Sequence, residues 1–242
     1  MRVRREFVMS WVVLTSLAAC ANVQVQDRQT LVEGKQPRPG HIYVRDFVAA
    51  PEDVPAESAL AGQATADSAP QTPEQIALGR EIGAELAKEL AAEIAAMGLP
   101  AEQASSPPAL EVNDLEIRGT LLSVVEGSAT ERVAIGMGKG AAELKVAVEG
   151  FQMTEQGLRK LGSGTVDTNA SKTPGAAVPL VVAVATKNPL GLIVSTGVKL
   201  HDEHTGSATI HGKAKDVAKE IATELRPRFE QQGWIAPSTG TP

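Results

Sequence analysis

Two long stretches of the chain repeat apolar residues at the spacing of a helix. The first follows Thr72, and its apolar positions recur every four residues at Leu78, Ile82, Leu86, Leu90 and Ile94. Thr72 and Gln75 form a capping-box pattern around Pro73, which suits the first helical position. Gly98 and Pro100 stop the pattern. The sequence therefore predicts a helix of about 25 residues, about 37 Å long, that packs across one face of a sheet.

The second helical stretch runs from about Ser207 to Gln232. Its apolar face carries Ile210, Val217, Ile221, Leu225 and Phe229. Pro227 lies within the stretch and is expected to kink or end the helix, because proline removes a backbone hydrogen bond and its ring crowds the preceding turn. Trp234 follows the helix and is predicted to fold back into the core.

Four other segments have the character of strands. They are residues 41–48, 110–125, 141–153 and 161–170, and the third alternates most clearly, through Leu144, Val146 and Val148. Together with the two helices, these segments predict an α+β fold. The expected architecture is a small, mostly antiparallel sheet of about four strands packed by two long helices.

The N-terminus has the organisation of a bacterial lipoprotein signal. Three arginines in the first five residues precede an apolar run, residues 8–17, that is too short to span a bilayer. The run closes on Leu17-Ala18-Ala19-Cys20, which resembles the lipobox of bacterial lipoproteins. The resemblance implies that residues 1–19 are removed and that Cys20 carries palmitate and diacylglycerol, anchoring the chain to a membrane that faces the periplasm. Because Ala21 is not aspartate, the resemblance favours the outer membrane over the inner.

Charge and cysteine content exclude several classes of partner. Removing residues 1–19 takes three arginines and one glutamate from the 23 basic and 29 acidic residues, so the formal charge moves from -6 to -8. An acidic chain is a poor ligand for nucleic acid or for an anionic lipid surface, which leaves the acyl chains as the membrane anchor. Cys20 is the only cysteine, so no internal disulfide can form.

The remaining chain is long enough for one domain with a sizeable core. Polar residues and prolines indicate a tether at residues 20–40, followed by a single domain at 41–235 and a loose tail at 236–242. Within the domain, the Ala-, Pro- and Ser-rich residues 51–73 are expected to form a loop.

A glycine-rich segment, Gly136-Met137-Gly138-Lys139-Gly140, could cradle a phosphate. Phosphate loops, however, run from a strand into a helix, whereas these glycines lead into strand periodicity, and no Lys-Ser or Lys-Thr pair closes the motif. The segment is therefore interpreted as a connection between antiparallel strands, and no nucleotide is expected.

Apolar side chains dominate residues 174–200 on both sides of Pro189. Each half is shorter than the roughly 20 residues that a membrane-spanning helix needs. Core packing, an oligomer contact, interfacial helices and paired membrane strands all remain open. The interaction surface is predicted to include Leu180, Val182, Leu190, Leu192, Ile193 and Val194.

Three of the four histidines, His201, His204 and His211, lie within eleven residues beside Asp202 and Glu203. This composition could ligate a transition metal. The neighbouring Thr205-Gly206 indicates a solvated turn, which is the favoured interpretation. We therefore expect no bound metal, no other cofactor and no catalytic residue.

Four motifs resemble the domain-of-unknown-function 4410 family of bacterial lipoproteins. They are Asp53-Val54-Pro55-Ala56-Glu57-Ser58-Ala59, the glycines of 136–140, Asn188-Pro189-Leu190-Gly191-Leu192-Ile193-Val194, and Gln232-Gly233-Trp234-Ile235. The family has no established activity, so the resemblance assigns no functional residue. The order of elements also resembles the periplasmic domain of curli-channel-type lipoproteins and of lipoprotein activators of peptidoglycan synthases, but fold alone does not determine function.

These observations predict a lipid-anchored, non-enzymatic binding or assembly module of the cell envelope. Its expected partner is another protein or further copies of the same chain. Two alternatives are an oligomeric pore or export accessory component of the outer membrane, in which residues 174–200 insert into the bilayer, and a metal-dependent periplasmic enzyme that uses the histidines.

Overall fold

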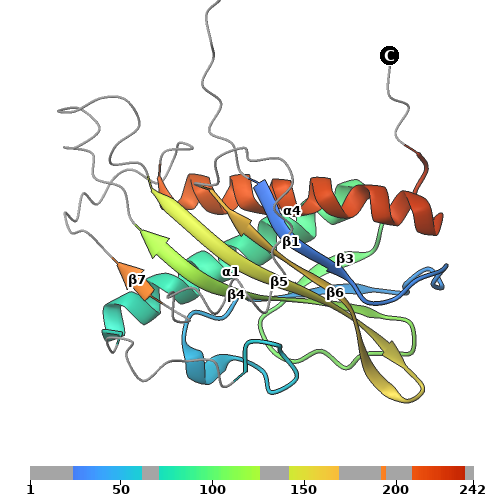
Figure 1. Cartoon of the computed structure of the whole chain (residues 1–242), viewed down its shortest axis with the longest axis horizontal. Coiled ribbons are helices and arrows are strands. Elements are labelled where there is room, and N and C mark those ends of the chain that lie inside the picture. The colour runs from blue at the N-terminus through green and yellow to red at the C-terminus, as the bar shows by residue number, and fades with distance from the viewer. Residues whose placement is uncertain (1–23, 62–70, 126–141, 169–191, 195–208, 238–242) are drawn as a thin grey trace, which may run out of the picture.

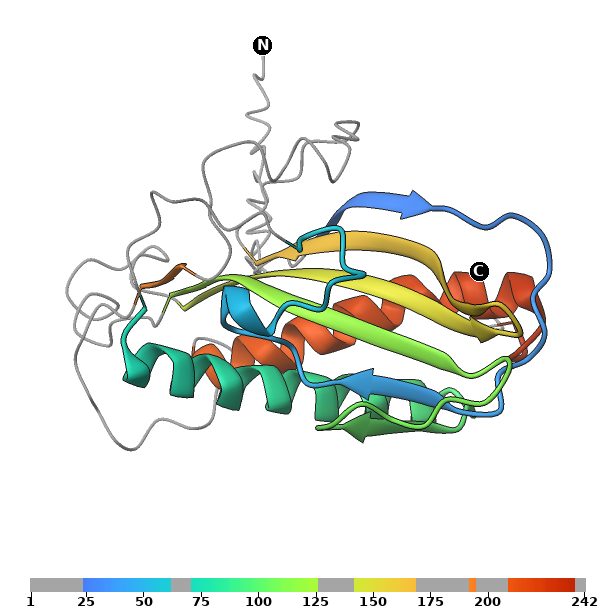
Figure 2. The ribbon, with the colours of Figure 1, turned by 90° about the horizontal axis from the view of Figure 1, so that it is seen from below.

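The computed structural model describes residues 24–61, 71–125, 142–168, 192–194 and 209–237. In these residues two long helices pack on one face of a seven-stranded sheet (Figures 1 and 2). The elements in chain order are β1 (Gln24–Thr30), β2 (Ile42–Arg45), the short 3-10 helix η1 (Pro51–Asp53), α1 (Pro73–Ala96), β3 (Ala101–Ala104), β4 (Leu115–Val125), β5 (Glu143–Thr154), β6 (Gly157–Asp167), β7 (Leu192–Val194) and α4 (Ile210–Gln232).

The sheet is larger than predicted and mixed. Its strand order is β1-β6-β5-β4-β2-β3, with β7 paired to β4. The pairs β1–β6, β6–β5 and β5–β4 are antiparallel, whereas β4–β2, β2–β3 and β4–β7 are parallel. The α+β class is confirmed, but the prediction of a mostly antiparallel sheet of about four strands was wrong. The physical reason is the helical crossover: α1 carries the chain back along the sheet, so β3 enters parallel to β2.

Four predicted strands are present as β2, β4, β5 and β6. The strand β1 was not expected, because residues 20–40 were interpreted as a tether. Instead Gln24 pairs with Asp167 and Thr30 pairs with Gly162, so β1 extends the sheet beside β6. The expected loop at 51–73 contains η1, and its residues 62–70 lie outside the described part of the chain.

The first helix begins where its capping box predicts. The Thr72 backbone N–H donates to Oε1 of Gln75 at 2.8 Å, and the Gln75 backbone N–H donates to Oγ1 of Thr72 at 3.3 Å. These reciprocal bonds satisfy backbone donors that the first turn of a helix leaves unpaired. After Met97, Gly98 adopts a left-handed φ of 87°, which ends the helix as predicted.

The second helix does not end at its proline. Pro227 lies inside α4, which continues to Gln232 and ends at Gly233 with φ 76°. The helix was expected to kink or end at Pro227, and the expectation that it ends there was wrong because both Pro227 and Thr223, four residues earlier, are exposed. Water can therefore hydrogen-bond to the carbonyl that Pro227 leaves without a donor, while the apolar face of α4 stays packed.

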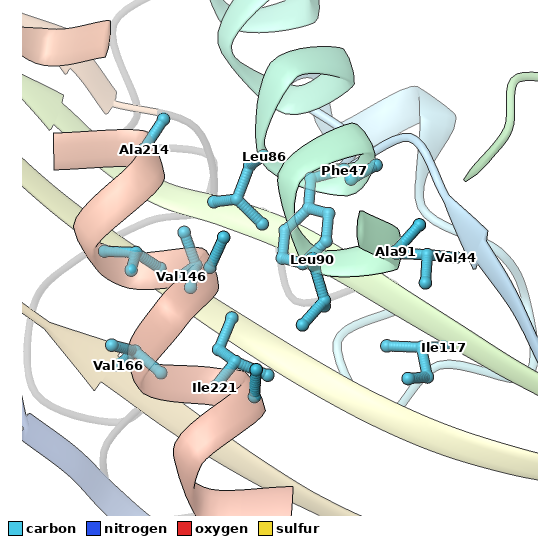
Figure 3. Close-up of a cluster of buried hydrophobic side chains, with 14 of the residues drawn as sticks. Val44, Phe47, Leu86, Leu90, Ala91, Ile117, Val146, Val166, Ala214 and Ile221 are labelled. Atoms are coloured by element: carbon cyan, nitrogen blue, oxygen red, sulfur yellow. The ribbon is translucent and has the colours of Figure 1, made fainter. Parts of the chain in front are cut away.

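The main core lies between the two helices and the sheet (Figure 3). Leu86 and Leu90 of α1 and Ile221 of α4 point toward the sheet, where Val146 and Val166 form part of the opposite wall. Trp234 is 7% exposed and joins this cluster, which confirms its predicted place in the core.

Candidate functional site

A groove of about 190 Å³ opens between the C-terminal half of α4 and strands β1, β6, β5 and β4. Its floor is the sheet face that carries the main core. The walls are apolar and include Ile117, Val148, Leu161, Ile221, Leu225 and Phe229. The groove thus continues the core outward, and its apolar surface is available to a ligand.

Glycines create the space in this groove. Gly150 of β5 pairs with Gly162 of β6, so two adjacent strands carry no side chain where they face α4. A Cβ atom added to Gly150 would have no heavy atom within 4 Å, which shows that the missing side chain leaves open space. A Cβ on Gly162 would lie 2.5 Å from the Gln29 carbonyl oxygen, so that glycine also allows β1 to approach. Gly164 lines the groove two residues further along β6.

The mouth of the groove is polar. The side chain of Arg28 in β1 forms an ion pair with Glu224 of α4, and Nη2 of Arg228 donates to Oγ1 of Thr30. A second, more polar pocket of about 410 Å³ adjoins this mouth and shares Arg28, Thr30 and Arg228 with the groove. One end of the apolar groove therefore meets guanidinium groups.

The mouth is held in place by contacts with the end of α4. The Gln36 backbone N–H donates to Oε1 of Gln232 at 2.5 Å, and Nε2 of Gln232 donates to the Gly34 carbonyl oxygen at 3.0 Å. The indole Nε1 of Trp234 donates to the Gln36 carbonyl oxygen at 3.1 Å. These bonds fix the segment after β1 against the helix, so the mouth is pre-formed.

The opposite face of the sheet carries a buried charge cluster. Glu116 is 2% exposed, and its carboxylate accepts from Arg45 at 3.1 Å and from Arg118 at 2.8 Å. Arg118 also donates to Glu57 at 3.2 Å, and its guanidinium lies 4.8 Å from the centre of the Phe151 ring. Every ionised group in this cluster has an opposite charge beside it, as buried charges require.

The electrostatics of the cluster follow from these contacts. Burial lowers the pKa of Arg118, but hydrogen bonds and charge attraction from Glu116 and Glu57 outweigh burial and raise the pKa. A hydrogen bond from its own backbone amide lowers the pKa of Glu57, burial opposes this effect, and Arg118 adds to the lowering. Both groups are therefore held in their charged forms.

The charge cluster attaches the segment after η1 to the sheet. Beside the Glu57–Arg118 bond, the Ala59 backbone N–H donates to Oε1 of Glu149 at 3.0 Å, and Leu60 packs with Ala147. Glu149 in turn accepts from Nζ of Lys160 at 2.5 Å. We interpret this face as structural, because its contacts hold the segment after η1 against the sheet. The groove is the candidate functional site.

Most of the residues that the sequence singled out lie outside the described part of the chain. These are Cys20, Leu180, Val182, Leu190, His201 and His204, together with the glycines of 136–140. Within the predicted interaction segment, Leu192, Ile193 and Val194 form β7 and pair in parallel with residues 123–125 of β4. That part of the segment belongs to the sheet.

His211 lies in the first turn of α4, and its Nδ1 is 2.5 Å from Oε2 of Glu85 in α1. This contact joins the two helices. Among the described residues, no group of three or more His, Cys, Asp or Glu side chains is placed to hold a metal ion. Within the same ranges, neither long helix combines the length and apolar character that crossing a bilayer demands.

Sequence reasoning missed the groove because it did not compare glycines across strands. The available signal was Gly150 in one predicted strand and Gly162 and Gly164 in the next. Glycines inside strands mark close backbone approach or missing side-chain volume. The strand register was needed to place Gly150 opposite Gly162.

Comparison with known proteins relates the chain to a family model and to a solved structure. No curated protein matches it. A solved structure of a PelC dodecamer from Paraburkholderia phytofirmans is similar with a TM-score of 0.39 and 10% sequence identity, over 84% of this chain and 97% of that chain. The family model described as domain of unknown function, DUF4410, matches residues 42–186, which is more than half of the chain. The chain therefore belongs to the DUF4410 family, as its sequence motifs predicted.

Proposed function

We propose that this protein is a lipid-anchored component of the cell envelope that acts by binding rather than by catalysis, and that the groove beneath α4 is its binding site. The observation that carries the proposal is the open apolar space at Gly150, between two strands and a helix. Concave, largely apolar sites with a few polar groups at the mouth are the usual form of ligand sites.

The membrane anchor is supported by the lipobox-like sequence that ends at Cys20. Only residues 21–23 separate Cys20 from Gln24, the first residue of β1. A chain of this length spans no more than about 14 Å. A lipidated Cys20 would therefore hold the end of the sheet at Gln24 and Asp167 close to the bilayer. The tether would then be far shorter than the predicted residues 20–40.

The groove lies toward the other end of β1, at Arg28–Thr30. Since β1 has seven residues, its far end lies about 20 Å beyond Gln24. With β1 directed outward from the bilayer, the mouth at Arg28–Thr30 would face the periplasm, where it can meet a ligand. The outer membrane remains the favoured location.

The residues around the groove favour binding over catalysis. Catalytic carboxylates normally act in pairs or beside a histidine or nucleophile. Glu224, whose carboxylate lies at the mouth, is already paired with Arg28. Glu116 also borders the groove, but Arg45 and Arg118 hold its carboxylate on the opposite face of the sheet. Neither carboxylate is arranged as a general base toward the groove.

Labelled-palmitate incorporation with membrane fractionation tests the anchor. We expect the native chain to incorporate label and to sediment with membranes, and Cys20→Ala to lose both properties. A Cys20→Ala chain that stays in the membrane would contradict the proposed anchor. If deletion of residues 174–200 then released it, the apolar segment would be the tether and the pore alternative would lead.

Binding of an uncharged apolar dye, N-phenyl-1-naphthylamine, tests the groove. We expect the folded mature chain to enhance dye fluorescence saturably. Gly150→Leu should abolish this enhancement, because the leucine side chain fills the open space. Thr223→Leu, which adds a similar side chain at an exposed position of α4, is the matched control and should bind dye normally. Equal dye binding by Gly150→Leu and the native chain would contradict this site.

A further inference from the structure

We propose that the groove binds a single-chain aliphatic carboxylate, with the hydrocarbon between α4 and the sheet and the carboxylate at Arg228. This inference rests on the groove being the binding site, as proposed above, and it specifies the chemical class of the ligand.

The dimensions and lining of the groove suit a hydrocarbon chain. A volume of about 190 Å³ exceeds that of an engineered apolar cavity of about 150 Å³ that takes up benzene. The floor is open at Gly150, where an added Cβ atom would meet no heavy atom within 4 Å, and the neighbouring groove residues Gly162 and Gly164 also carry no side chain. Open space at Gly150 between aliphatic walls suits a slender, unbranched chain.

The charges at the mouth favour an anionic head. Arg228 lines both the groove and the adjoining polar pocket. Two acids lie nearby: Glu224 forms an ion pair with Arg28, and Glu33 lines the polar pocket. In the part of the chain that the structure describes, no carboxylate forms an ion pair with Arg228, whose Nη2 donates to the neutral hydroxyl of Thr30. Its remaining donors match the fork geometry with which arginine binds a carboxylate.

Trp234 provides an intrinsic fluorescence probe of ligand binding in the groove. The chain has two tryptophans, and Trp11 lies in the segment 1–19 that processing is expected to remove. Trp234 lines the groove and would be the sole tryptophan of the mature chain. A bromine atom on a bound hydrocarbon would therefore quench tryptophan fluorescence only if the hydrocarbon lies near Trp234.

The first experiment titrates 10-bromodecanoate into the mature chain carrying Cys20→Ser, which keeps the protein free of its own lipid. We expect saturable quenching of Trp234 that decanoate reverses. Gly150→Leu should lose the quenching, whereas Thr223→Leu should keep it. Quenching that is absent in a chain that still binds the uncharged dye would overturn the ligand class and leave the binding site intact. Failure of both probes would overturn the proposed function itself.

The second experiment tests whether the site recognises the carboxylate head group, by competition between decanoate and decanol. In the native chain, decanoate should displace the brominated acid at about ten-fold lower concentration than decanol, the ratio expected for one hydrogen-bonded ion pair. Arg228→Gln should remove this preference. Arg226→Gln, which removes a guanidinium of α4 that lines neither pocket, is the matched control and should retain it. Equal displacement by acid and alcohol in the native chain would overturn the assignment of Arg228 to the carboxylate.

Discussion

The ring of Phe47 packs directly on Gly119, at a point where β4 has no side chain. A Cβ atom on Gly119 would lie 2.0 Å from Cδ1 of Phe47, well inside van der Waals contact. Phe47 itself is 1% exposed, and its backbone N–H donates to the Gly83 carbonyl oxygen of α1 at 3.2 Å. A Cβ atom added to Gly83 would lie 2.1 Å from the Phe47 carbonyl oxygen, so this close approach requires glycine. The segment after β2 is thus held between α1 and β4 by two glycines.

Gly119→Ala is therefore expected to destabilise the protein. Overpacking of a rigid core typically costs about 1–3 kcal/mol, and the buried Phe47 ring has little room to move. Urea unfolding followed by circular dichroism measures this loss. Gly150→Ala is the matched control within the same sheet, because its added methyl group meets open space. Equal stability losses in the two variants would contradict the packing argument.

Glu116→Gln should destabilise the fold strongly. The change removes the charge that pairs with both Arg45 and Arg118, and it leaves two guanidinium groups without their buried counter-charge. Breaking a buried ion pair from one side typically costs about 3–5 kcal/mol. Thermal and urea unfolding measure the effect. Glu52→Gln, at an exposed position of η1, is the control and should change little.

Glu57 should make a small, pH-dependent contribution to stability. Because its folded-state pKa is lowered, its contribution is present above the unfolded-state pKa and is lost as pH falls through the folded-state value. The relevant range is about pH 4 and below. The native chain should therefore be more stable than Glu57→Gln at pH 7, and the difference should shrink toward pH 3. A constant difference across this range would show that the Glu57 charge is not responsible.

Gly150→Leu should lose ligand binding without losing stability. The added side chain buries apolar surface in open space, so the free energy of unfolding should stay the same or rise by about 1 kcal/mol. Thermal unfolding of the variant, measured beside the dye titration, separates a filled site from an unfolded protein. A large drop in the unfolding temperature would show that the groove is needed for packing.

Local patterns in the sequence determined the helices, the longer strands and the family. Thr72 and Gln75 define the start of α1 because the capping box acts within one turn, and Gly98 and Gly233 end the helices through their own backbone conformation. Alternation in β5 is likewise visible without knowledge of its neighbours. Each of these features depends on residues close together in the chain.

The tertiary structure decided the remaining strands and the candidate site. Polar β1 and four-residue β3 have little apolar pattern of their own, and they become strands through hydrogen bonds with β6 and β2. Pro227 is tolerated because packing leaves its turn of α4 facing solvent. The groove exists because strand register places Gly150 beside Gly162 beneath α4. Such long-range pairings depend on the whole fold, so no local pattern could reveal them.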